Sequence, residues 1–138
     1  MDCRHLLDTN IVLFFLFDKK ELDRRVRDIL DNRNNLFYIS TASVQEIIHL
    51  YNGGKFQSAW KKAEDILPSI EAVHFELLPV KRAHLAAYAT LSTLSGHNDP
   101  NDHIIISQAI AERMMLISSD RKFDFYTRQK LDLIFNNR

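Results

Sequence analysis

Cysteine, glycine and proline are scarce in this sequence, and their scarcity excludes several classes of protein. The 138 residues include one cysteine, three glycines and three prolines. Cys3 alone cannot form an internal disulfide, and the chain has no cluster of cysteines and histidines with zinc-site spacing. The only glycine pair, Gly53-Gly54, is predicted to end a helix and not to form a linker. We therefore expect a single domain spanning residues 1–138.

Long apolar runs and an excess of charge are missing as well. The apolar stretch Ile11–Phe17 is far shorter than the ~20 residues that cross a bilayer, and it follows Asp8, unlike a signal peptide. We expect no contact with a membrane and a reducing cytoplasm as the location. The 18 basic and 18 acidic residues cancel to zero formal charge, which argues against strong nonspecific binding to nucleic acids.

Short apolar runs alternate along the chain with stretches in which apolar residues recur at helical spacing. The expected strands end near Leu7 and cover residues 36–39, 73–80, 115–118 and 131–135. The expected helices run to residue 17, from a capping box at Asp18 and Glu21 to residue 30, around 44–51, 57–67 and 81–94, and from residue 100 onward. Pro68 is expected to end the helix before it. This alternation predicts an α/β fold with a parallel sheet covered on both faces.

Acidic residues stand at four points where such a fold places its chemistry. Asp8 and Asp120 follow strands, whereas Glu46 and Asp102 lie near the starts of helices. Ligands of open parallel sheets bind beyond the carboxyl ends of the strands. Two carboxylates gathered there would repel by about 4 kcal/mol at ~4 Å and an effective dielectric near 20. A hard divalent cation with oxygen ligands removes that repulsion, so the pattern predicts a metal site and phosphate chemistry.

Each of these acids also has a structural interpretation. Asp8 could cap the following helix, and Asp120 could be an ordinary turn residue. Ser43 and Glu46 have the spacing of a capping box, although the helix could begin earlier, and Glu46 could equally be a solvated surface acid. Asp102 falls at the third helical position, where the helix dipole stabilises a charge whatever its function.

The polar neighbours of the acids leave similar alternatives open. Asp99 precedes Pro100 and is expected to cap the next helix. Asn10 could add a neutral oxygen to a metal shell or cap a helix. Ser118 and its neighbour Ser119 could position a phosphate or a water, or simply finish the strand.

Other polar and aromatic residues are expected to have no catalytic part. The four histidines without regular ligand spacing are assigned to surfaces or loops: His49, His84, His97 and His103. The cluster Phe14-Phe15-Phe17 is expected to join the core, and a surface for a partner is its second interpretation.

The motifs, taken in order, resemble those of PIN-domain ribonucleases, and most closely the toxins of VapBC-type toxin–antitoxin pairs. The resemblance covers essentially the whole chain. It is carried by four segments: Leu6-Leu7-Asp8-Thr9-Asn10, Ser43-x-x-Glu46, His97-x-Asp99-Pro100-x-Asp102-x-x-Ile105-Ile106-x-Gln108-Ala109, and Ser118-x-Asp120-x-x-Phe123.

The resemblance implies a three-layer α/β/α sandwich that binds Mg²⁺ or Mn²⁺ and hydrolyses phosphodiester bonds in RNA. It makes Asp8, Glu46, Asp102 and Asp120 the catalytic and metal-binding quartet. Asn10, Ser118 and Asp99 would support that quartet. It also implies a cognate antitoxin as partner and a homodimer.

Three positions depart from the family pattern. Asn101 stands where an aromatic residue is common, and His103 stands where the family often has arginine. Lys130-Leu131 replaces a frequent glycine–hydrophobic pair. The missing arginine could weaken binding to the RNA backbone or alter the choice of substrate, but none of these changes removes an acid.

Three other functions compete with the nuclease interpretation. A haloacid-dehalogenase-type phosphatase also uses an aspartate after its first strand, but its second acid is Asn10 here. A receiver domain needs a phosphorylatable aspartate at a central strand and a late lysine, and neither stands out. The third is a non-catalytic module that binds RNA or protein on the same scaffold.

Overall fold

A single parallel sheet organises the chain. The computed structural model describes residues 3–138, and its five strands follow the order β3-β2-β1-β4-β5. Every neighbouring pair of strands in this sheet is parallel. The strands are β1 Arg4–Leu7, β2 Leu36–Ser40, β3 Glu76–Leu78, β4 Met115–Ser118 and β5 Asp132–Phe135.

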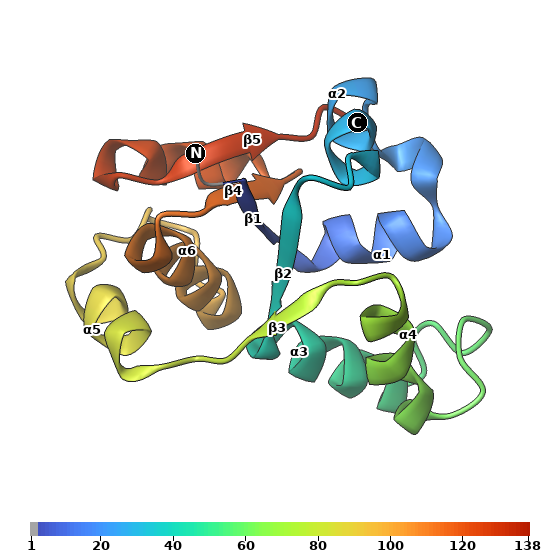
Figure 1. Ribbon diagram of the computed structural model, residues 1–138. Helices are drawn as coiled ribbons and strands as arrows, with labels where there is room; N and C mark the ends of the chain where they lie inside the picture. The colour runs from blue at the N-terminus through green and yellow to red at the C-terminus, as the bar shows by residue number, and fades with distance from the viewer. Residues whose placement is uncertain (1–2) are drawn as a thin grey trace.

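Helices connect the strands and cover both faces of the sheet (Figure 1). The α-helices are α1 Thr9–Phe17, α2 Arg24–Asp31, α3 Thr41–Asn52, α4 Ile66–Ala72, α5 Arg82–Thr90 and α6 Pro100–Glu112. Three 3₁₀ helices, η1 to η3, cover Lys19–Glu21, Ala63–Asp65 and Arg121–Gln129. Within residues 3–138, no helix has the length and apolar character needed to span a membrane.

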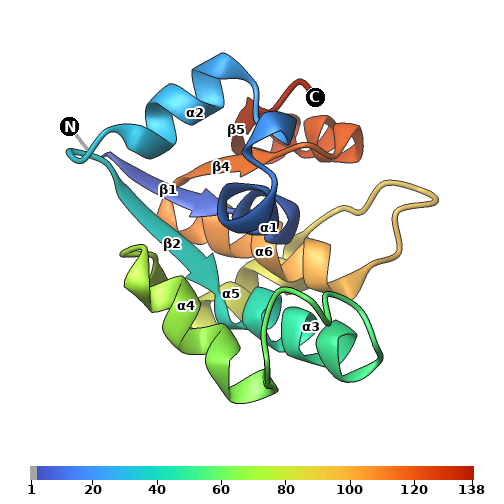
Figure 2. The ribbon, with the colours of Figure 1, turned by 90° about the vertical axis from the view of Figure 1, so that its right-hand side faces the viewer.

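Side chains of the central strands alternate between two cores. Leu7 of β1 and Ile117 of β4 pack with α1, α2, α3 and α4 on one face. Their neighbours Leu6 and Leu116 pack with α6 and η3 on the other face. Alternation of this kind follows from the two-residue period of a strand. In Figure 1, α5 and α6 lie on one side of the sheet and α1 and α2 on the other; Figure 2 shows α2 from the side. The expected three-layer α/β/α sandwich is confirmed.

The order in which strands are added to the sheet changes direction at β1, and this places Asp8 and Asp120 side by side. The chain proceeds from β1 to β2 and β3 on one side, whereas β4 and β5 are added on the other. Leu7 therefore has Ile39 and Ile117 as its two neighbours. The backbone N–H of Asp8 donates to the carbonyl of Ile117 at 3.0 Å. Such a switch point is where open α/β sheets bind ligands.

The predicted start of α2 is wrong. Asp18 and Glu21 do not form a capping box, because residues 19–21 make a separate 3₁₀ turn and the side chain of Asp18 makes no capping hydrogen bond. The helix begins at Arg24, where the side chain of Asp23 accepts from the N–H of Val26 at 2.8 Å. Asp23 gives the true cap because it directly precedes the first helical residue.

The predicted helix 57–67 is also wrong. Residues 53–59 form turns, and Trp60 anchors the segment: its carbonyl accepts from the Tyr51 hydroxyl and its indole N–H donates to Ser69. Pro68 lies inside α4 at the third helical position. Proline is tolerated in a first turn because no N–H there has a helical acceptor. The third predicted strand and the helix after it are shorter than expected, at residues 76–78 and 82–90.

Candidate active site

Asp8 lies buried at the end of β1, at the base of the site. Its exposed fraction is 6%. One carboxylate oxygen accepts from the N–H of Thr9 at 2.8 Å, which also caps α1, and the other accepts from the Ser118 hydroxyl at 2.9 Å. The pKa of Asp8 is raised to about 7, chiefly by burial and then by the charge of Asp102, against the hydrogen bonds from Ser118 and Thr9 that lower it.

Asp120 comes from the end of the neighbouring strand and is tied to Asp8 through one hydroxyl. The Ser118 hydroxyl that donates to Asp8 accepts the N–H of Asp120 at 3.0 Å. The Asp120 side chain accepts from the N–H of Lys122 at 2.9 Å and so begins η3. Ser118 is fully buried, so it holds the two aspartates in place and is not exposed to a phosphate or a bulk water.

Asp102 reaches the site from the first turn of α6. Asp99 caps this helix by accepting from the N–H of Asn101 at 2.9 Å, as expected, and Pro100 occupies the first helical position. The carboxylate of Asp102 accepts from Nε2 of His97 at 2.9 Å. Burial raises the pKa of Asp102, the His97 hydrogen bond lowers it, and the charges of Asp99 and Asp120 raise it.

Glu46 extends from α3 and is fixed by Thr9. Its carboxylate oxygen lies 3.0 Å from the Thr9 hydroxyl, which also lies 2.9 Å from the hydroxyl of the buried Ser43. Burial raises the pKa of Glu46, the Thr9 hydrogen bond lowers it, and the charges of Asp99 and Asp102 raise it. The capping box of Ser43 and Glu46 is not formed, because α3 begins earlier and Ser40 caps it.

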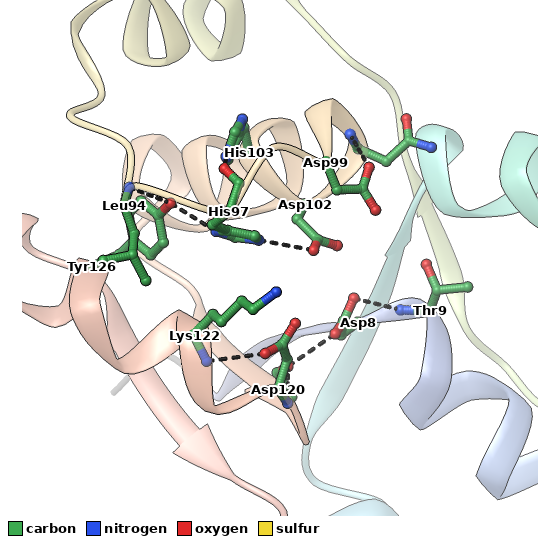
Figure 3. Close-up of polar contacts among 12 residues, drawn as sticks. Asp8, Thr9, Leu94, His97, Asp99, Asp102, His103, Asp120, Lys122 and Tyr126 are labelled. Atoms are coloured by element: carbon green, nitrogen blue, oxygen red, sulfur yellow. Dashed lines mark hydrogen bonds and ion pairs between the residues drawn. The ribbon is translucent and has the colours of Figure 1, made fainter.

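The structure therefore brings acids from separate segments to one space. Figure 3 shows the carboxylates of Asp8, Asp102 and Asp120 directed toward one another, with the Lys122 side chain extending into the space between them. One ligand atom each of His97, Asp102 and Asp120 lies within 4.8 Å of the others. The raised pKa of Asp8 and Asp102 is the expected result of carboxylates crowded away from water.

Asn10, predicted to support the quartet, lies in the first turn of α1. It is exposed and lines a hollow of about 500 Å³ beside α1, together with apolar side chains of α1 and of the 56–59 turn. Its neighbour Phe17 is 50% exposed and packs edge-on against Trp60 at 4.9 Å between ring centroids. Phe14 and Phe15 pack against the core, as expected, whereas Phe17 presents part of its ring to the surface.

The prediction of surface or loop roles is wrong for His84 and His103, which lie in helices α5 and α6; His97 does lie in a loop, but it is buried there. His84, His97 and His103 are buried, and only His49 of the four is exposed. His97 contacts Asp102 directly, and His103 donates from Nε2 to the carbonyl of His97 at 2.8 Å. Sequence spacing alone missed these contacts because they depend on how the 91–99 loop folds back over α6.

The donor set suits a hard divalent cation. The converging groups are carboxylates with the imidazole of His97 beside them, and carboxylates are the ligands that Mg²⁺ and Mn²⁺ prefer in proteins. The pKa of Asp8 is raised chiefly by burial and further by the charges of Asp102 and Asp120, and a cation at this point would offset that repulsion. The residues present therefore fit a bound metal.

The fold and the acidic centre define an α/β sandwich whose site lies at the switch point of its sheet. A sequence description of the PIN domain matches residues 5–128, and the chain therefore belongs to the PIN-domain family. This membership sets aside the haloacid-dehalogenase and receiver-domain interpretations. Comparison with curated protein sequences gives no significant match.

Solved structures share the fold at low sequence identity. A chain of VapBC2 from Rickettsia felis, bound to a promoter DNA fragment, matches with a TM-score of 0.71 and 20% identity, over 97% of this chain and 99% of that chain. VapBC-1 from nontypeable Haemophilus influenzae matches with a TM-score of 0.65 and 19% identity, over 96% and 97%. FitAcB from Neisseria gonorrhoeae matches with a TM-score of 0.64 and 23% identity, over 96% of each chain.

Proposed function

We propose that this protein is a metal-dependent endoribonuclease that hydrolyses phosphodiester bonds in RNA. The observation that carries the proposal is the convergence of Asp8, Asp102 and Asp120, from three separate segments, on one space in a PIN-family chain. Asp8, Asp102 and Asp120 would hold Mg²⁺ or Mn²⁺, and Glu46 would be the fourth acid of the site, beside the ion. When bound, the cation polarises the scissile phosphate and makes water a better nucleophile.

Glu46 is the proposed proton acceptor. It is half-buried, its pKa is raised by burial, and the Thr9 hydroxyl fixes one of its oxygens. A raised pKa brings a carboxylate closer to the value that suits general-base catalysis near neutral pH. The attacking water gives its proton to Glu46 while its oxygen bonds to phosphorus. The bond from phosphorus to the leaving ribose oxygen breaks, and that oxygen takes a proton from solvent.

Lys122 is the proposed contact for the RNA backbone. Its side chain extends into the space between the aspartates (Figure 3). An ammonium group at this position can bind a non-bridging phosphate oxygen. Lys122 would thereby take over part of the role of the arginine that the family often carries where His103 stands.

An RNA-cleavage assay with matched variants tests the proposal. Purified protein should cleave labelled RNA in Mg²⁺ or Mn²⁺ and stop in EDTA. Asp120→Asn and Asp8→Asn should each lower the rate at least ~100-fold, because each loses a charged metal ligand. Asp124→Asn is the matched control: it removes an exposed acid of the same 3₁₀ helix and should cleave normally.

The assay also separates the nuclease from a non-catalytic module. Unchanged cleavage by either purified site variant would refute the assignment. RNA binding without cleavage, combined with no Mn²⁺ binding in calorimetry, would favour a binding module on the same scaffold.

The toxin role is part of the same proposal. The structural neighbours named above come from VapBC and FitAB-type complexes. The hollow beside α1, lined by Phe14, Phe17 and Phe56, provides an apolar surface on which an antitoxin could dock. Induction of the wild-type gene alone should arrest growth, and induction of the Asp120→Asn gene should not. Equal growth arrest by both would contradict the toxin role.

We further propose a homodimer that works in the cytoplasm, where Cys3 stays reduced. Light scattering should give twice the chain mass of 16.1 kDa. A monomer at micromolar concentration would contradict the dimer.

A further inference from the structure

A line of hydrogen bonds runs from the backbone of the 91–99 loop to the acidic centre. The N–H of Leu94 donates to the Tyr126 hydroxyl at 3.1 Å. That hydroxyl lies 2.8 Å from Nδ1 of His97, and Nε2 of His97 lies 2.9 Å from the carboxylate of Asp102. Figure 3 shows the whole line, which ends at the oxygen of Asp102 nearest to His97.

The direction of each bond follows from the groups themselves. A backbone N–H can only donate, so the Tyr126 oxygen accepts from Leu94. Tyr126 is fully buried, and its own hydrogen needs an acceptor, which Nδ1 of His97 provides. The imidazole therefore carries its hydrogen on Nε2 and donates it to Asp102.

The His97 ring is also held by its packing. It is 3% exposed and lies edge-on to His103, at 4.9 Å between ring centroids. It also packs against Phe123 at 5.8 Å. His103 donates from Nε2 to the carbonyl of His97 at 2.8 Å, which fixes the backbone of the same residue. These contacts pack the ring in place beside Asp102.

We propose that His97 is a positioning residue that orients the Asp102 carboxylate for the metal; this inference rests on the proposed function. The Nε2 hydrogen holds one oxygen of Asp102 and leaves the other free for a cation. Because its Nε2 lone pair is replaced by that hydrogen, His97 does not itself ligate the metal, although the atom lies within 4.8 Å of ligand atoms of Asp102 and Asp120. Tyr126 sets the tautomer on which this arrangement depends.

A residue that orients a metal ligand without touching the metal has a measurable effect on metal affinity. Loss of a group that orients a ligand costs roughly 10- to 100-fold in metal affinity or activity. We therefore expect His97→Leu to raise the Kd for Mn²⁺ by at least 10-fold and to lower kcat by a similar factor. His97→Gln places an amide N–H where Nε2 stood and should restore most of both. Tyr126→Phe should have a smaller effect in the same direction, about 3- to 10-fold.

The pair of buried His84 and partly exposed Glu112 is the matched control. His84 is fully buried, and its Nε2 lies 2.7 Å from Glu112 at the other end of α6. His84→Leu should lower thermal stability and leave the Mn²⁺ Kd of the folded protein unchanged. Titration of each variant with Mn²⁺ in a calorimeter, together with kcat and KM on RNA, therefore separates positioning from simple stabilisation.

The Mn²⁺ titrations and the RNA assay test the positioning role and the proposed function separately. An Mn²⁺ Kd that is equal in wild type and folded His97→Leu protein would overturn the positioning role. If His97→Leu does not fold, an unchanged Kd for Tyr126→Phe overturns it instead. Wild-type protein that binds Mn²⁺ but leaves RNA intact would overturn the proposed function alone, because the Kd series still tests His97. Wild-type protein that binds no Mn²⁺ would overturn both.

Discussion

The buried carboxyl of Asp8 has a pKa of about 7, against an ordinary value of 3.8, chiefly because burial disfavours its charged form. A pKa that is about three units higher corresponds to ~4 kcal/mol between the two protonation states. Metal binding needs the charged form, whereas the metal-free fold favours the neutral one. Without a bound cation, ionisation of Asp8 therefore costs free energy in the folded state.

The stability of the metal-free protein should consequently depend on pH. Because the pKa is raised in the folded state, the contribution of Asp8 is fully present below about pH 4 and is lost as pH rises through about 7. In EDTA, urea unfolding should give a free energy several kcal/mol lower at pH 8 than at pH 5, and Mn²⁺ at pH 8 should restore it. Glu46 and Asp102, whose pKa values are also raised, act in the same direction.

Asp8→Asn is the control for this dependence. It keeps the shape and removes the charge, so it should flatten the profile and raise the stability at pH 8 by about 1–4 kcal/mol in EDTA. An equal pH profile for the variant and the wild type would show that Asp8 is not the responsible group.

The Thr9 hydroxyl should matter for rate more than for stability. It is the contact that fixes Glu46, at 3.0 Å. Thr9→Val keeps the branched shape and should lower kcat about 10-fold if Glu46 takes the proton, with a loss of about 1 kcal/mol in unfolding free energy. Thr9→Ser keeps the hydroxyl and should retain most of the rate. Steady-state kinetics on RNA check this, and a full rate in Thr9→Val would remove Glu46 from the proposed proton transfer.

The acids could be predicted from the sequence, whereas their supporting residues could not. Asp8 and Asp120 directly follow strands, and Asp102 follows a proline that starts a helix, so local pattern locates them. His97 is held by Tyr126, which lies 29 residues further along the chain. Thr9 acts on Glu46, 37 residues away. The spacing of residues within one segment of the sequence does not reveal contacts between residues so far apart.

At the level of elements, Asn136 joins the end of β5 to the start of α2. Its amide donates to the hydroxyl of Ser119 at 2.8 Å and to the carbonyl of Glu21 at 2.9 Å. Its carbonyl oxygen accepts from the N–H of Asp23 at 2.7 Å. Since Ser119 directly precedes Asp120, this contact also supports the loop that carries a site residue.

Asn136→Ala should therefore destabilise the fold. Asn136 is fully buried, and three hydrogen bonds would lose their partner, so we expect a loss of about 2–3 kcal/mol in the free energy of unfolding. The exposed neighbour is the control: Asn137→Ala should change it by less than about 0.5 kcal/mol. Urea denaturation measures both, and equal stabilities would show that Asn136 does not join the two elements.

The strands and longer helices were predictable, because the spacing of their apolar residues and their capping residues indicate the same element over several residues. The run from Leu36 to Ile39 and the Asp99-Pro100 cap are examples, and both formed as expected. The region before α4 was not predictable, since it is anchored by Trp60. The carbonyl of Trp60 accepts from the Tyr51 hydroxyl, and its indole N–H donates to the Ser69 hydroxyl. Tertiary contacts of one tryptophan, through its backbone carbonyl and its indole, outweigh the helical pattern there.

For the molecule as a whole, balanced charge limits how RNA can be held. Because the formal charge is zero, electrostatic attraction of RNA has to come from local cations such as Lys122. In EDTA, Lys122→Ala should weaken RNA binding and reduce the slope of log affinity against log salt by about 0.7, the value for one phosphate contact on a single strand. Lys130→Ala, at an exposed residue beyond η3, is the control. An unchanged slope in Lys122→Ala would exclude the phosphate contact.

The order of the strands is what makes one site out of distant segments. Because β1 and β4 are neighbours, their carboxyl ends place Asp8 and Asp120 together, and α6 adds Asp102 from the adjoining face. The central claim is that these three carboxylates share a cation.

Diffraction from crystals grown with Mn²⁺, with anomalous data collected to locate manganese, tests that claim most directly. The account predicts a strong anomalous peak about 2.0–2.3 Å from carboxylate oxygens of Asp8, Asp102 and Asp120, lost in Asp120→Asn crystals. Saturating Mn²⁺ that gives no peak among these three residues, or peaks only at other acids of the surface, would contradict it.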